Sequence, residues 1–106
     1  MPLKNIIWDE AALYDFDLIF LYYQALSTTA AKKIQKEILK RTRQLAKYPL
    51  SGLADYDANT LGDIRYIIYL HWRIYYKLMG NDDVLIFKIF DMRQNPDRKL
   101  SDIKLT

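Results

Sequence analysis

The sequence predicts an α+β fold in which an N-terminal helix hairpin packs on one face of a small, mainly antiparallel sheet of three or four strands. Two observations support this prediction. Apolar residues recur at helical spacing through residues 10–48, and runs of β-branched and aromatic residues joined by short turns fill residues 64–90. Because 106 residues are the usual size of one domain, residues 1–106 are expected to form a single unit around one core.

The first two elements are a short strand and a helix. The apolar segment from Leu3 to Trp8 predicts a strand, and Asp9 is able to cap the helix that follows it. That helix is expected from Glu10 to Leu26, with acidic residues at its start, where the helix dipole favours negative charge. Its buried face is predicted to carry Leu13, Phe16, Phe20 and Tyr23.

A second helix is predicted from Thr29 to Tyr48, after a short break that makes the two helices an antiparallel hairpin. Pro49 ends this helix, because proline disfavours helical geometry in the residue before it. The buried face is expected to hold Ala31, Ile34, Ile38 and Leu45. The opposite face carries one acid, Glu37, against seven cations, which are Lys32, Lys33, Lys36, Lys40, Arg41, Arg43 and Lys47.

The second half of the chain predicts an antiparallel meander that follows a loop extending to Gly62. Its three strands are expected from Ile64 to Leu70, from Trp72 to Leu78, and from Val84 to Phe90. A turn at residues 80–83 separates the last two.

Composition limits the classes of function. The chain has no cysteine and one histidine, His71, which excludes disulfides, thiolate and multi-histidine metal sites, and a cysteine nucleophile; no metal or cofactor is expected. The N-terminus lacks the pattern of a signal peptide and no apolar run is long enough to span a bilayer, so we expect a cytoplasmic protein without a membrane partner. A net charge of +3 and a pI of about 9.1 favour acidic partners.

Five stretches, taken in order and at their spacing, resemble the RelE/ParE toxin superfamily over nearly the whole chain. They are Asp17–Tyr23, Leu45–Gly52, Ile64–Tyr69, Trp72–Lys77 and Ile89–Pro96. The resemblance implies a toxin of a type II toxin–antitoxin pair, held inactive by a cognate antitoxin. RelE-like members cut messenger RNA on the ribosome, whereas ParE-like members inhibit DNA gyrase. The two long helices and the proline–glycine exit from the hairpin favour the ParE-like branch.

Arginines are the candidate activity residues. Cleavage of RNA by its own 2′-hydroxyl needs a base, an acid, and a cation over the phosphate. The predicted sheet offers Arg65, Arg73 and Arg93, and the resemblance places Arg65 and Arg93 where the nuclease branch carries functional arginines. On one concave face these side chains would hold a phosphate bidentately. The alternative is that each pairs with an acid such as Asp63 or Asp91.

Proton-transfer groups are scarce around these arginines. The segment from Met92 to Leu100 contains neither the tyrosine nor the histidine that RelE-like enzymes carry there, and Asp91 stands where many relatives have histidine. His71 is a weak candidate acid or base, because a lone histidine at a hairpin corner is more often a packing residue. No catalytic residue is assigned. A ribosome-dependent endoribonuclease and an inactive partner-binding module remain the alternatives to a gyrase inhibitor.

Two surfaces are candidates for binding a partner. Off the expected buried face of the first helix lie Tyr14, Leu18, Leu21 and Tyr22, a surplus of apolar residues that we expect to bind the antitoxin. A wide buried face or a homodimer would also account for them. The basic face of the second helix either serves only to keep the chain in solution or attracts an acidic antitoxin to this surface. Residues 97–106 either dock as a short element or stay mobile until a partner arrives.

Overall fold

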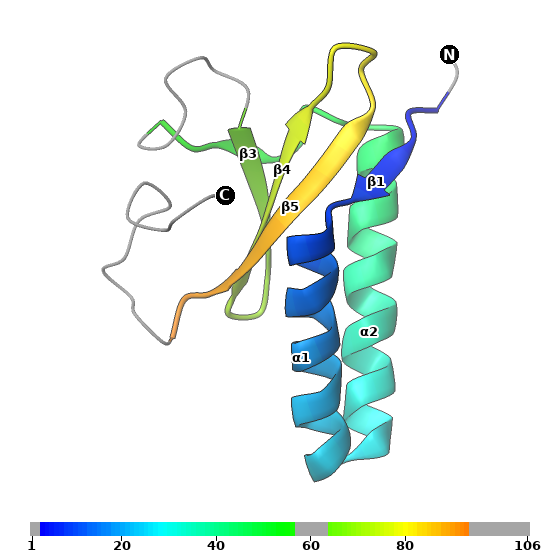
Figure 1. The fold of residues 1–106 in the computed structure, drawn as a ribbon, viewed down its shortest axis with the longest axis vertical. Coiled ribbons are helices and arrows are strands. Elements are labelled where there is room, and N and C mark those ends of the chain that lie inside the picture. Colours follow the sequence, from blue (N-terminus) through cyan, green and yellow to red (C-terminus); the bar gives the residue numbers. More distant parts are fainter. Residues whose placement is uncertain (1–2, 57–63, 94–106) are drawn as a thin grey trace.

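Two helices cover one face of a five-stranded sheet in the computed structural model, which describes residues 3–56 and 64–93 (Figure 1). The helices are α1 (Glu10–Leu26) and α2 (Thr28–Arg43), and a short 3₁₀ turn, η1 (Gln44–Ala46), continues α2. The strands are β1 (Ile6–Trp8), β2 (Leu53–Ala54), β3 (Ile64–Tyr69), β4 (Trp72–Leu78) and β5 (Val84–Asp91). The expected α+β hairpin-on-sheet architecture is confirmed.

The sheet has the order β1-β5-β4-β3-β2, and its only parallel pair in the described residues is β1 with β5. The prediction of three or four strands was one too low, because the segment predicted as a loop contains β2. That strand is two residues long, with Leu53 opposite Tyr66 and Ala54 opposite Arg65. A strand so short has no periodicity to detect, and its pairing with β3 alone defines it.

Both helices begin within one residue of the prediction, and α1 also ends at the predicted residue. Asp9 occupies the N-cap position of α1 but its side chain makes no capping hydrogen bond, contrary to the expected role. Ser27 does cap α2, because its hydroxyl accepts a hydrogen bond from the amide of Ala30 at 3.2 Å. The α-helical part of α2 ends at Arg43 rather than Tyr48, and the chain tightens into η1 before Pro49.

The core lies between the helix hairpin and the sheet. The second helix buries its predicted face, but α1 is rotated from the prediction: Leu13 is 47% exposed, whereas Ala12 is fully buried. The side chain of alanine is small enough to let α1 approach the sheet closely, and this packing outweighs the greater hydrophobicity of leucine. The core cluster is Ala12, Phe16, Ile34, Ile38, Leu45, Tyr69, Trp72, Ile74, Tyr76, Val84, Ile86 and Ile89.

A β-bulge in β5 ties α1 to the sheet. Tyr75 lies opposite Lys88 and Tyr76 opposite Ile86, so β5 carries one extra residue at this point. The carboxylate of Asp15 on α1 accepts hydrogen bonds from the amide of Ile89 at 3.0 Å and from the ammonium of Lys88 at 3.3 Å. The helix therefore supplies the acceptor for an amide next to the irregular part of the ladder.

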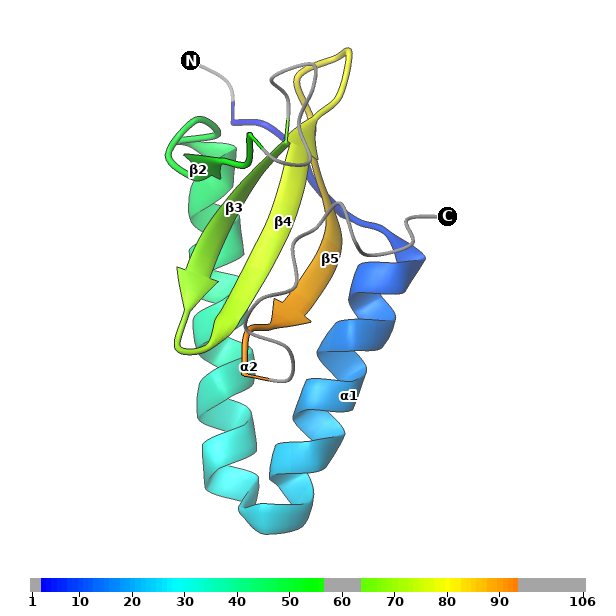
Figure 2. The same ribbon diagram turned by 90° about the vertical axis from the view of Figure 1, so that its left-hand side faces the viewer.

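The hairpin is longer than the sheet that it covers. Both ribbon views show the turn between α1 and α2 extending well past the end of β3, β4 and β5 (Figure 2). Within the described residues no helix combines the length and apolar character needed to cross a bilayer.

Candidate functional site

Arg65 is held by the loop that leaves the helix hairpin. Its guanidinium donates hydrogen bonds to the carbonyl of Gly52 at 2.9 Å and of Leu50 at 3.4 Å. In β3 it lies opposite Tyr76, whose side chain belongs to the core, so Arg65 lies on the helix side of the sheet. The acid expected as its partner, Asp63, is outside the described residues. Among the described residues, the hydrogen-bond partners of Arg65 are the carbonyl oxygens of this loop.

Arg73 lies on the other face of the sheet. Its guanidinium stacks over the ring of Tyr66 at 4.6 Å from the ring centre, and Tyr66 is the neighbour of Arg65 along β3. Consecutive residues of a strand point to opposite faces, so Arg65 and Arg73 are separated by the sheet. Arg73 also donates to the hydroxyl of Tyr75 at 3.3 Å, and this hydrogen bond raises the pKa of Arg73.

A buried acid, Asp55, completes this cluster and was not singled out from the sequence. Asp55 is 7% exposed and forms a hydrogen bond with the hydroxyl of Tyr75. Burial raises the pKa of Tyr75, which therefore stays protonated at neutral pH. The hydroxyl of Tyr75 therefore joins Asp55 to Arg73, whose buried Nε has no hydrogen-bond partner among the described residues. The only sequence signal for the acid was its position directly after a short apolar pair, which many loop aspartates share.

Arg93 and His71 do meet, around Asp91. One guanidinium nitrogen of Arg93 lies 3.2 Å from a carboxylate oxygen of Asp91, and Nε2 of His71 lies 3.9 Å from the same oxygen. Although burial favours the neutral acid, the bonds and charge of Arg93 and the charge of His71 lower the pKa of Asp91. Asp91, the acid predicted as the alternative partner of Arg93, is therefore present. The guanidinium of Arg93 is already paired with this carboxylate.

His71 is packed against an aromatic ring at the turn between β3 and β4. Its ring centre lies 4.0 Å from that of Trp72, and its side chain is 19% exposed. Burial, and then the charge of Arg93, lower the pKa of His71 against the opposing effect of Asp91. Its Nε2 has no hydrogen-bond partner. Among the described residues, the candidate cations and this one candidate base therefore do not converge on a common pocket.

The four candidate antitoxin-binding residues form a continuous exposed stripe on α1. Tyr14, Leu18 and Tyr22 follow one another at steps of four residues, and Leu21 lies three residues after Leu18. Each of the four is about half to two-thirds exposed. None of them belongs to the core cluster. These apolar side chains therefore remain exposed in the folded chain and are not part of a wider buried face. We refer to these four residues as the α1 stripe.

The described residues offer no ready metal site. They contain no group of three or more histidine, cysteine, aspartate or glutamate side chains close enough to share an ion. The basic face of α2 lies outside both arginine clusters, and all seven of its cations are exposed. These exposed cations give this helix face a strongly positive charge.

Known proteins share both the sequence pattern and the fold. Residues 6–96 match the family model described as "ParE toxin of type II toxin-antitoxin system, parDE". Among solved structures, a chain of the chromosomal ParDE TA system from P. aeruginosa is similar, with 17% sequence identity and a TM-score of 0.67. The match covers 84% of this chain and 96% of that chain. No curated protein matches the sequence.

Proposed function

The chain belongs to the ParE toxin family of type II toxin–antitoxin systems, and from this we propose that it inhibits DNA gyrase by protein contact and is neutralised by a cognate antitoxin. The family match over residues 6–96 is the observation that carries the proposal. It supports the ParE-like branch over the RelE-like branch, in agreement with the branch that the sequence favoured.

The arrangement of the arginines favours protein contact over RNA cleavage. A nuclease needs a free cation above the phosphate with a base and an acid nearby. Arg65 is bonded to loop carbonyls, Arg73 lies on the other face of the sheet, and Arg93 is paired with Asp91. A phosphate clamp that used all three would have to break these contacts and cross the sheet.

The α1 stripe is the surface that we assign to the antitoxin. An amphipathic helix binds a partner through apolar residues at helical spacing, and the α1 stripe offers this pattern without disturbing the core. Apolar area of this kind is costly to leave in water, so a segment that folds onto it would be stabilised by its burial.

The test is to produce the chain without antitoxin and to assay growth, plasmid supercoiling and messenger integrity in the same culture, followed by supercoiling with purified gyrase. We expect arrested growth, lost supercoiling and intact transcripts. Transcripts cut at codon boundaries within minutes would contradict the proposal in favour of the endoribonuclease. Normal growth with both readouts intact would leave an inactive binding module.

A further inference from the structure

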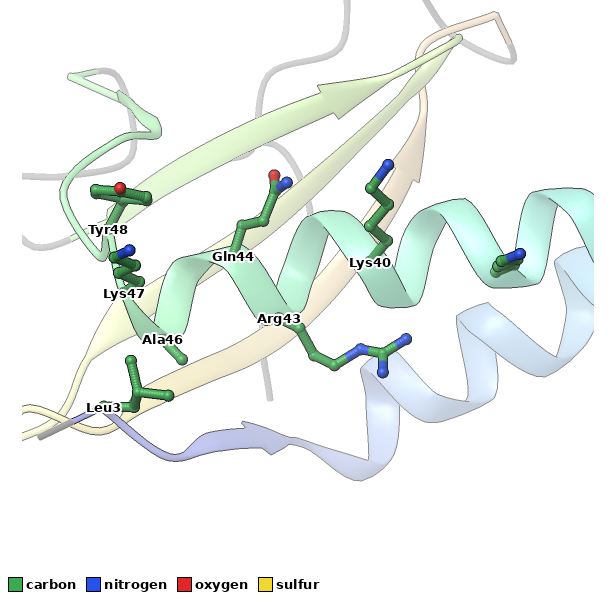
Figure 3. Close-up of a pocket in the computed structure, with 8 residues that line it drawn as sticks. Leu3, Lys40, Arg43, Gln44, Ala46, Lys47 and Tyr48 are labelled. Carbon is green, nitrogen blue, oxygen red and sulfur yellow. The ribbon is translucent and has the colours of Figure 1, made fainter.

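An open groove of about 450 Å³ runs along the C-terminal part of α2, where the N-terminal segment crosses it (Figure 3). The amide of Lys4 donates to the carbonyl of Ala46 at 3.0 Å, which fixes Leu3 beside η1. Leu3 is 68% exposed and Tyr48 57% exposed, so the end of the groove is apolar and accessible. The lining includes Leu3, Lys36, Lys40, Arg43, Lys47 and Tyr48.

The charge of this groove is unbalanced. Its four cations, Lys36, Lys40, Arg43 and Lys47, follow one another at steps of four, three and four residues, so they start from one face of α2 and its continuation. The side chains of Lys40 and Arg43 point to opposite edges of that face (Figure 3). None of them forms an ion pair with an acid of the described residues, and the lining contains no acid. Like charges at this spacing repel one another, so a bound anionic group would relieve a local cost.

We propose that this groove binds an acidic peptide segment of a partner protein, with carboxylates at the four cations and an apolar side chain seated against Leu3 and Tyr48. The combination of charge and apolar surface selects this occupant. Duplex DNA would satisfy the cations but has no side chain to cover Leu3. The ammonium of Lys47 lies 5.5 Å from the centre of the Tyr48 ring, so one face of that ring is already covered by a cation.

This inference concerns a different helix face from the α1 stripe and does not depend on gyrase as the target. Its test is therefore a binding measurement on the purified full-length chain, read by the fluorescence anisotropy of a labelled peptide rich in glutamate and leucine. A second peptide with glutamine in place of every glutamate serves as the uncharged probe. An unlabelled DNA duplex serves as the competitor.

The variants are chosen in matched pairs. The double substitution Lys36→Gln with Lys40→Gln removes two charges from the groove, and Lys32→Gln with Lys33→Gln removes two exposed charges from the same helix outside it. Leu3→Ser removes the apolar contact, and Leu53→Ser changes a similarly exposed leucine on β2. All these positions are on the surface, so the fold is expected to survive each change.

We expect the groove pair to weaken binding of the acidic peptide about tenfold and its matched pair to change binding by less than about twofold. Leu3→Ser should weaken binding severalfold and Leu53→Ser should not. Equal losses in the two double variants would overturn the proposal, because they would show a diffuse effect of net charge. It would also be overturned by equal binding of the uncharged peptide, or by a DNA duplex that binds more tightly than the peptide through the same lysines.

Discussion

Position 52 needs a glycine because the hydroxyl of a buried tyrosine lies directly against its backbone. The amide of Gly52 donates to the hydroxyl of Tyr76 at 2.9 Å, and that hydroxyl donates to the carbonyl of Pro49 at 2.7 Å. A β-carbon added to Gly52 would lie 2.5 Å from the same oxygen and 2.9 Å from the carbonyl of Tyr66. The loop from Pro49 to Gly52 therefore encloses the hydroxyl of Tyr76 and leaves no room for a side chain at position 52.

Gly52→Ala is accordingly expected to lower the free energy of unfolding by about 1–3 kcal/mol, the usual cost of overpacking a filled interior. Gly80→Ala provides the matched control, because nothing lies within 4 Å of the position that its β-carbon would take. Urea denaturation of both variants and of the original chain measures the difference. Equal stability of the two alanine variants would show that the loop moves aside without cost.

His71 is expected to make stability depend on pH. Its pKa in the folded chain is lowered, chiefly by burial, whereas in the unfolded chain it titrates near its ordinary value of 6.5. The unfolded state therefore binds the proton more readily, and stability is full above about pH 6.5 and falls as the pH drops below it.

Unfolding by urea at pH 7.5 and pH 5.5, for the original chain and for His71→Gln, checks this effect. We expect the variant to lose less stability between the two pH values. Asp91 does not confuse the result, because its pKa is lowered from an already acidic value of 3.8 and it stays ionised at both. The same loss in both proteins would mean that the imidazole accepts its proton equally well in the folded and unfolded chains.

At the scale of elements, features that depend on local patterns could be predicted from the sequence, and features that depend on pairing with distant segments could not. The bounds of α1 and β4 were predicted to the residue, because each depends on periodicity and on its own breakers. The rotation of α1, the strand β2 and the partners of Arg65 were not, because each depends on a segment distant in the chain. The exposure of the α1 stripe was foreseeable as an excess of apolar residues, but the separation of Arg65 from Arg73 requires the register of β3 against β4.

The α1 stripe carries its own prediction. Leu18→Ala and Tyr22→Ala are each expected to raise the dissociation constant for the antitoxin about fivefold or more, as truncation of an interface anchor does. Because neither side chain is in the core cluster, arrest of growth by the free chain should persist. Calorimetric titration of the co-encoded antitoxin into the purified chain measures this, with Leu53→Ala as an exposed control on β2. Wild-type affinity in both stripe variants would move the antitoxin to another surface.

At the scale of the whole molecule, β1 closes the fold by joining the two ends of the described chain. Ile6 lies opposite Val84 and Trp8 opposite Ile86, although almost the whole fold separates them in sequence. The carbonyl of Asn5 accepts from the amide of Val84 at 2.8 Å, and the ring of Trp8 meets that of Phe16 edge-on at 5.3 Å. This strand holds α1 against the edge of the sheet.

Trp8→Ala is therefore expected to lower the melting temperature of the whole chain by roughly 10 °C, because a large partly buried aromatic ring contributes a few kcal/mol. Ile7→Ala changes the neighbouring residue, which is 44% exposed, and should shift the melting temperature by only a few degrees. Circular dichroism followed separately at helix and aromatic wavelengths gives the measurement. A loss of aromatic signal that precedes the loss of helix would show that side-chain packing fails before the helices unfold, so that the change is not one cooperative transition.

The part of the helix hairpin that extends past the sheet is expected to open locally more often than the rest of the fold. In the part that extends past the sheet, α1 and α2 pack mainly on each other: Ala31 near the start of α2 is buried yet lies outside the core cluster, and Leu26 at the end of α1 is 68% exposed. Amide hydrogens near this turn should exchange with deuterium far sooner than those of β4, through openings that leave the sheet intact. A partner that covers the turn would slow this exchange first, so deuterium uptake there would report binding before any change in the global melting curve.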